Sequence, residues 1–186
     1  MTLYPSSNQY GIPDLLLDDL GVGLPSPVLP WGSTKRSALH SGTWHHYVDD
    51  YRFGGIWADP DAPIRTQCAA IVEPNYSVTP ETPLAECLWH TYRKRWLGRH
   101  WQSSGVQVWV DLYVDGPANR EANLTGIPAG WQRFATVGTS VDALRADLAT
   151  AHSFALDAVL ICYAGPADVA AECVNLGVIH IPRGRR

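Results

Sequence analysis

The chain has 186 residues, of which 46% are hydrophobic and 17% are charged, and its formal net charge is −4. A chain of this length fits one domain that buries roughly 70% of its unfolded surface, and this apolar content excludes disorder over most of its length. The negative charge disfavours broad nucleic-acid binding, which needs clustered Lys and Arg. Basic runs at residues 93–95 and 183–186 keep nucleic acid as a minor alternative.

The sequence predicts no membrane contact and a reducing compartment. No run approaches the roughly 18 apolar residues of a membrane helix, and the first residues lack the pattern of a signal peptide. Three cysteines, Cys68, Cys162 and Cys173, lie inside apolar runs, and none of these forms a metal-type pair with another or with Cys87. We therefore expect four reduced, buried cysteines in a cytoplasmic protein.

Residues 1–42 are predicted to form an arm that packs on a single α/β domain, residues 43–186. The arm is rich in Pro, Gly and Ser, and proline removes a backbone donor, so no long helix or central strand is expected there. A short helical turn is expected at residues 14–20. The anchors that we expect on the domain are Leu15, Leu16, Leu17 and Trp31.

The rest of the chain alternates between predicted strands and helices. Strands are expected at residues 44–48, 67–72, 106–110, 133–137, 158–163 and 178–181. Helices are expected from Pro83 to about residue 103, from the capping residue Ser140 to about residue 155, and over residues 166–176, where Gly177 ends the last one. Residues 117–130 are expected to be irregular, with one helical turn.

This order predicts an α/β fold with a parallel sheet of about six strands and crossover helices. Two architectures remain open, a reduced barrel of the TIM type and an open parallel sheet, because six strands are too few for a complete eightfold barrel. The barrel is preferred because no Gly-rich phosphate-binding loop follows any strand.

Three segments resemble an uncharacterised family of phage, plasmid and prokaryotic proteins, the domain of unknown function DUF4417. They are residues 46–53 (HYVDDYRF), 73–77 (EPNYS) and 92–102 (YRKRWLGRHWQ), and the last is the most specific. The resemblance leaves out the arm and the extreme C-terminus. Glu73 departs from the family pattern, where Asp is common, and Asp111 is the candidate least supported by it. The resemblance implies a fold and a phage or mobile-element origin, hence a host cytoplasm, but no reaction.

Carboxylates follow the first predicted strands, where parallel α/β folds bind their ligands. Carboxylates gathered on one rim need a divalent cation, a raised pKa or arginine partners. Mg²⁺ or Mn²⁺ would suit these oxygens, and a carboxylate pair without metal would suit acid–base chemistry. Loop Asp and Asn that bond only their own backbone are the structural alternative. The candidates are catalytic Asp49, Asp50, Glu73 and Asp111, with Asp49 and Glu73 as metal ligands, and substrate-binding Tyr51, Arg52, Asn75 and Tyr76.

The long helix carries a separate group of cations. Arg95 and Arg99 fall inside its apolar arc of about 140°, whereas Arg93 and Lys94 fall outside it and are expected to face solvent. A buried Arg needs a carboxylate or an anion. Because a helix that starts at the rim runs away from it, Arg95 and Arg99 are expected about 20 Å from Glu73, as structural or anion-binding residues.

Two functional hypotheses follow. The first is a small phage or mobile-element enzyme whose carboxylate site, with Mg²⁺ or Mn²⁺ as an optional cofactor, acts on a phosphate-containing or nucleotide-like substrate. The second is a non-enzymatic protein that binds a host protein through an exposed patch on the long helix, such as Trp101 with Arg93 and Lys94. No zinc signature and no Ser or Cys nucleophile motif is present.

Overall fold

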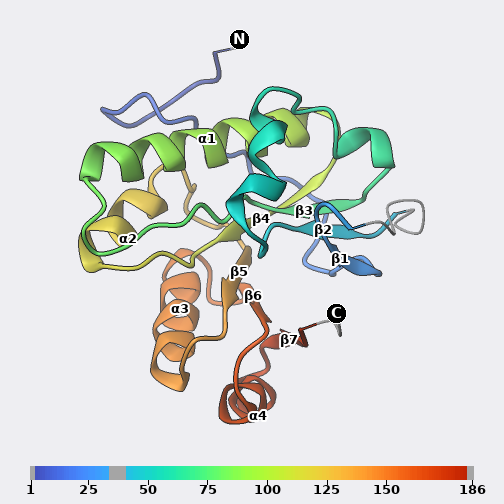
Figure 1. The fold of residues 1–186 in the computed structure, drawn as a ribbon, viewed down its shortest axis with the longest axis vertical. Coiled ribbons are helices and arrows are strands. Elements are labelled where there is room, and N and C mark those ends of the chain that lie inside the picture. The colour runs from blue at the N-terminus through green and yellow to red at the C-terminus, as the bar shows by residue number, and fades with distance from the viewer. Residues whose placement is uncertain (1–2, 34–40, 184–186) are drawn as a thin grey trace.

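Seven parallel strands, paired in the order of the chain, form one sheet in the computed structural model, which describes residues 3–33 and 41–183. The strands are β1 (Val28–Pro30), β2 (Thr43–His45), β3 (Ala70–Val72), β4 (Gln107–Asp111), β5 (Arg133–Val137), β6 (Val159–Tyr163) and β7 (Ile179–Ile181). The helices are α1 (Leu84–Ser103), α2 (Pro117–Leu124), α3 (Val141–Phe154) and α4 (Ala167–Leu176). Figure 1 shows α1 above the β3–β4 part of the sheet and α3 and α4 beside its β5–β7 part.

The sheet is curled into an incomplete barrel. Tyr47 follows β2 and Tyr163 ends β6, yet their stacked rings have centroids 5.3 Å apart. In a flat sheet, four strand spacings of about 4.8 Å would hold them about 19 Å apart. The two ends of the strand order, β1 and β7, remain as edges. The predicted α/β fold of the barrel type is therefore confirmed.

The seventh strand, β1, comes from the arm, where no central strand was expected. Its residues pair with β2 on one side only, so β1 is an edge strand. Pro30 is tolerated there because an edge strand has one side without ladder bonds. The sequence count of about six strands missed this three-residue segment.

The arm also contacts the domain beyond β1, without the helical turn expected at residues 14–20. The Leu15 backbone N–H donates to the Gly126 carbonyl at 2.8 Å, and the Gln102 side chain bonds both backbone groups of Leu16. Leu15 and Trp31 are buried, but Leu16 and Leu17 are 54% and 57% exposed, so their predicted role as anchors was wrong.

The predicted helix ends are close to the observed ones. The Ser140 side chain caps α3 by accepting from the Ala143 N–H, and Gly177 ends α4 in the left-handed conformation. Pro83 stands just before α1, and the Thr82 hydroxyl accepts from the Thr79 backbone N–H. α2 has eight residues rather than the single turn expected.

Alternate residues of each strand face two different cores, as the twofold period of a strand requires. In β4, Val108 and Val110 face the helices, whereas Trp109 belongs to the cluster on the inner, concave side of the sheet. At the amino-terminal end of β5, Arg133 closes this concave side with the arm, by an ion pair to Asp18 and a hydrogen bond to the Gly21 carbonyl.

All four cysteines are free and buried, as predicted. Within the described ranges, no helix has both the length and the hydropathy needed to cross a membrane.

Candidate functional site

Glu73, the first residue after β3, is completely buried and forms an ion pair with Arg95 of α1. The Arg95 Nη1 atom lies 2.5 Å from both carboxylate oxygens of Glu73. Glu73 Oε2 also accepts from the Asp111 N–H at 3.2 Å, and Arg95 donates to the carbonyls of Thr125 and Asn123. The pair therefore joins β3, β4, α1 and the segment after α2.

The expected separation of about 20 Å between Arg95 and Glu73 was wrong. That estimate placed the start of α1 at the rim, but residues 74–83 carry the chain away before α1 begins at Leu84. Eleven residues of α1, or about 16 Å of rise, then bring Arg95 back over Glu73. The expectation that Arg95 meets a carboxylate was right.

Asp111, the last residue of β4, forms a second buried ion pair, with Lys94. Lys94 Nζ donates to Asp111 Oδ2 at 2.9 Å, to the Asp111 carbonyl at 3.0 Å and to Asn123 Oδ1 at 2.7 Å. The Asn75 amide and the Tyr47 hydroxyl each donate to the Asp111 carboxylate at 3.0 Å. Burial, and then the Asp111 charge, raise the pKa of Tyr47.

Lys94 was expected to face solvent but is only 2% exposed. Its three ammonium protons have three acceptors, which is how a buried cation is stabilised. Taken together, Glu73, Asn75 and Asp111 of the predicted rim share one buried polar network, and Arg95 and Lys94 supply its positive charge.

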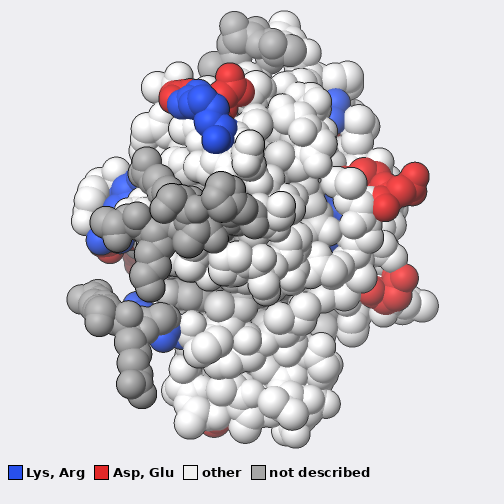
Figure 2. Space-filling view, turned by 90° about the vertical axis from the view of Figure 1, so that its right-hand side faces the viewer, with Lys and Arg blue, Asp and Glu red and all other residues white. Residues whose placement is uncertain are grey.

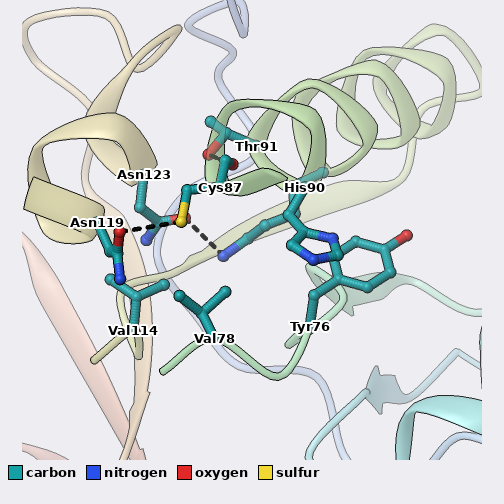
Figure 3. A pocket seen from close by; sticks show the side chains of 9 residues that line it. Tyr76, Val78, Cys87, His90, Thr91, Val114, Asn119 and Asn123 are labelled. Atoms are coloured by element: carbon teal, nitrogen blue, oxygen red, sulfur yellow. Dashed lines mark hydrogen bonds between the residues drawn. The ribbon is translucent and has the colours of Figure 1, made fainter. Parts of the chain in front are cut away.

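A small cavity of about 10 Å³ lies above this network, between α1, α2 and the loops after β3 and β4. Figure 3 shows its side chains: Tyr76, Val78, Cys87, His90, Thr91, Lys94, Val114, Asn119 and Asn123. The Cys87 thiol donates to Asn119 Oδ1 at 2.9 Å, across the cavity from the parallel rings of Tyr76 and His90. The space suits one water molecule.

Tyr76 is packed between cationic and aromatic neighbours rather than presented to a substrate. Its ring lies 3.9 Å from the Arg93 guanidinium carbon and stacks on His90. Burial raises the pKa of Tyr76 to about 12. Burial, and then the Arg93 charge, lower the pKa of His90.

The remaining rim candidates lie at the surface. The Asp50 carboxylate accepts from the backbone N–H and hydroxyl of Ser77, at 3.1 and 3.0 Å. Asp49 is exposed, Tyr51 is 77% exposed, and the exposed Arg52 donates to the Tyr51 hydroxyl at 3.4 Å. In the part of the chain that the structure describes, no three or more His, Cys, Asp or Glu side chains are grouped to hold a metal ion.

A groove of about 300 Å³ lies on the other side of α1, where the arm runs along the helix (Figure 1). It is lined by Tyr10, Ile12, Ala85, Leu88, Trp89 and Tyr92. Trp89 is 48% exposed and Tyr10 is 49% exposed. The Trp89 ring stacks on Tyr92, with centroids 5.6 Å apart, and meets Trp57 edge-on.

The apolar arc of α1 therefore faces away from the sheet. Positions 85, 88, 89, 92 and 96 lie within one side of the helix at 100° per residue, and the buried Thr91, Lys94, Gly98 and Trp101 lie on the other. Trp101, which was expected in an exposed patch, is 0% exposed and donates to the Pro60 carbonyl. Helical spacing found the apolar arc but assigned it to the wrong side, because the side that faces the sheet mixes the polar Thr91 and Lys94 with Gly98 and Trp101 and so shows no apolar pattern.

Figure 2 shows a face on which Lys and Arg are few and scattered, with Asp and Glu nearby or at the margins. This view shows no basic stripe of the kind that tracks a nucleic-acid backbone.

Comparison with known proteins found a family and two relatives. The family described as domain of unknown function DUF4417 matches residues 4–151. The gene 1 protein of Mycobacterium phage D29 is 33% identical over 147 residues, which cover 76% of this chain and 52% of the relative. The gene 1 protein of Mycobacterium phage L5 is 33% identical over 132 residues, which cover 68% of this chain and 56% of the relative. The chain thus spans about half the length of these relatives. No solved structure matches.

Proposed function

We propose, from the premise that the chain belongs to the DUF4417 family, that it is a binding protein of phage type that holds a segment of a host protein in the groove on α1. One observation carries this proposal: the apolar arc of the longest helix is turned away from the sheet and is partly exposed around Trp89. The host-binding function is the second of the two hypotheses from the sequence, with its patch moved from Trp101 to Trp89.

Physical chemistry favours a partner for this surface. A helix on a sheet ordinarily buries its apolar side, and a solvated apolar groove marks an interaction surface. Trp and Tyr are also the residues that most often dominate binding energy at protein interfaces. Trp89, Tyr92 and Tyr10 place such rings around one concave space.

The test compares the wild-type chain with Trp89→Ser and with Leu156→Ser, a control at another surface residue, which is 91% exposed. Proteins captured from a mycobacterial lysate, the host genus named for the relatives, are quantified by mass spectrometry, and the captured partner is then purified and titrated directly. We expect Trp89→Ser to weaken the affinity by about 30-fold, as for an interface hot spot. Equal affinities for the wild type and Trp89→Ser would overturn the proposal.

A small enzyme is the second candidate, because a buried Lys94–Asp111 pair and a polar cavity lie at the carboxyl ends of β3 and β4. This is where barrel-type folds carry out chemistry. Its substrate would be phosphate-containing or nucleotide-like, with Asp49 and Glu73 in acid–base roles or as ligands of Mg²⁺ or Mn²⁺. It ranks second because Arg95 and Lys94 already balance the charges of Glu73 and Asp111.

Asp49→Asn tests this candidate without disturbing the buried network, since Asp49 is exposed. Hydrolysis of a panel of phosphomonoesters and nucleotides is measured with and without MgCl₂ and MnCl₂. An enzyme of this kind loses at least about 100-fold in rate on Asp49→Asn, which is the lower end for a catalytic acid or base. Absence of turnover across the panel would remove the candidate.

A further inference from the structure

Two arginines of α1, Arg93 and Arg99, follow the groove residues along the helix and have no carboxylate partner among the described residues. Among the described residues, the arginines in ion pairs are Arg65, Arg95, Arg120, Arg133 and Arg145. Arg93 and Arg99 stack on rings instead: the Arg93 guanidinium lies 3.9 Å from the Tyr76 centroid and 5.4 Å from that of Trp89, and Arg99 lies 5.1 Å from that of Tyr4. Arg93 Nη2 also contacts His90 Nδ1 at 2.5 Å. The Nε atoms of both arginines are buried and lack a hydrogen-bond partner.

Both arginines lie toward the C-terminal end of α1 from the residues that line the groove. Arg93 is one turn after the groove residue Trp89, and Arg99 is two turns after the groove residue Tyr92, about 10 Å further along the axis and on the same side of the helix. Along α1, both arginines therefore come after the apolar residues that line the groove. Glu86, the acid in the first turn of α1, lies 3.6 Å from His90.

We infer that the groove binds an apolar and acidic segment of a partner protein, whose Asp or Glu residues meet Arg93 and Arg99. This inference rests on the proposed binding function and names the chemistry of its partner. A groove of this size admits two or three apolar side chains, and an amphipathic helix presents such anchors at spacings of three and four residues. The guanidiniums, which have no carboxylate partner among the described residues, then select acids one turn beyond the anchors, because the planar guanidinium matches a carboxylate with two parallel hydrogen bonds.

A nucleic acid would also offer an anion and flat rings, but the observations favour a protein segment. Single-stranded nucleic acid needs a cationic groove along its whole backbone, whereas the lining of this groove is apolar and the chain carries a net charge of −4.

The experiment pans a random twelve-residue peptide display library on the immobilised full chain and then titrates the most enriched peptide by fluorescence anisotropy. We expect peptides with Leu, Phe or Trp at helical spacing, followed by Asp or Glu. Arg93→Gln and Arg99→Gln should each weaken the affinity for the titrated peptide by about fivefold, the effect of one ion pair at an interface rim. Arg65→Gln, at an exposed arginine paired with Asp59, is the matched control.

The outcomes separate this inference from the function on which it rests. Enriched peptides without acids, whose affinity depends on Trp89 but not on Arg93 or Arg99, would overturn the inference and leave the binding function intact. Enrichment that is equal on Trp89→Ser would overturn both. Binding of a dT20 oligonucleotide that Trp89→Ser abolishes would assign the groove to nucleic acid, and self-association that Trp89→Ser abolishes would assign it to a second copy of the chain; either would overturn the inference.

Discussion

Lys94 and Arg95 are consecutive cations on α1, and each is buried against its own carboxylate, Asp111 or Glu73. Desolvating four charges costs several kcal/mol per ion, so the pairs persist only because the remaining donors find carbonyl and amide acceptors. Those acceptors lie at the end of α2 and just after it, at Asn123 and Thr125. The two residues therefore fix α1 to the ends of β3 and β4 and to α2.

Arg95→Met should destabilise the fold by about 3–5 kcal/mol, because it leaves the Glu73 carboxylate buried without a cation. The double variant Glu73→Leu/Arg95→Met should lose less stability than Arg95→Met, since it buries no unpaired charge. Urea unfolding monitored by Trp fluorescence measures both. Arg65→Met is the control, because its pair with Asp59 is exposed, and it should leave stability nearly unchanged. Similar losses of stability in Arg95→Met and Arg65→Met would contradict the stabilising role assigned to the buried Glu73–Arg95 pair.

The sequence predicted one of these two cations correctly and the other wrongly. Arg95 falls inside the apolar arc, and the rule that a buried Arg needs a carboxylate then predicts its partner type. Lys94 falls outside the arc and was expected in solvent, although it is 2% exposed. A long side chain can reach Asp111 and Asn123 from a position that helical spacing alone counts as polar. Only the tertiary contact decides its place.

At the scale of the element, α1 is held close to the sheet by a glycine. A Cβ atom at Gly98 would lie 2.9 Å from Leu15 Cδ2, 3.5 Å from Val108 Cγ1 and 3.6 Å from Glu73 Oε1. Gly98 therefore allows α1, the arm and β4 to meet at one point next to the Glu73–Arg95 pair. Helix propensity would disfavour a glycine here by about 1 kcal/mol relative to Ala, so packing decides its presence.

Gly98→Ala should destabilise the protein by about 1 kcal/mol, since overpacking of about 1–3 kcal/mol exceeds the gain in helix propensity. The same change in a Leu15→Val background should be neutral or stabilising, because the Cδ2 atom that it meets is gone. Thermal unfolding of the wild type, the two single variants and the double variant gives the coupling energy between positions 98 and 15. Gly55→Ala is the control, since its Cβ would meet nothing within 4 Å. A Gly98→Ala chain that is more stable than the wild type, with Leu15 unchanged, would refute this account of the packing.

The regular elements could be predicted from local sequence more fully than the short ones. α3 and α4 were placed by a capping Ser140 and a terminal Gly177, which satisfy backbone groups that any helix leaves open. β1 was missed because its three residues follow Pro27, end in Pro30 and show no period. Its place is set by pairing with β2, which is 15 residues further on at Val28 and Thr43. The candidate site was half predictable: strand ends located Glu73, Asn75 and Asp111, but no local signal located Lys94, Tyr47 or the groove at Trp89.

At the scale of the whole molecule, the curl of the sheet brings polar rings into its interior. His45 of β2 lies 4.5 Å from the Tyr163 ring of β6, and the adjacent His46 faces the other layer, where its ring stacks on Trp101 and its Nδ1 bonds the Val72 carbonyl. Both histidines are almost fully buried. Burial lowers the pKa of His45 to about 3 and that of His46 to about 4. Among the described residues, no carboxylate affects either ring enough to compensate a second proton.

These two pKa values make the stability of the fold depend on pH. In the unfolded chain both histidines titrate near 6.5, whereas in the fold they stay neutral down to about pH 4. Between these values the unfolded chain binds more protons, so stability rises with pH and the full contribution is present above about pH 6.5. Acidification from pH 7 to pH 5 should therefore remove about 4 kcal/mol. His90, whose pKa is also lowered, acts in the same direction.

Urea unfolding at pH 7, 6 and 5 measures the loss. Because each buried ring supplies part of the slope, His45→Gln and His46→Gln should each reduce it by about half, while His152→Gln, at an exposed histidine of α3, should leave it unchanged. A slope that survives in both buried-site variants would show that other groups carry the acid sensitivity, and the interior of the curled sheet would then have to tolerate a charged imidazole.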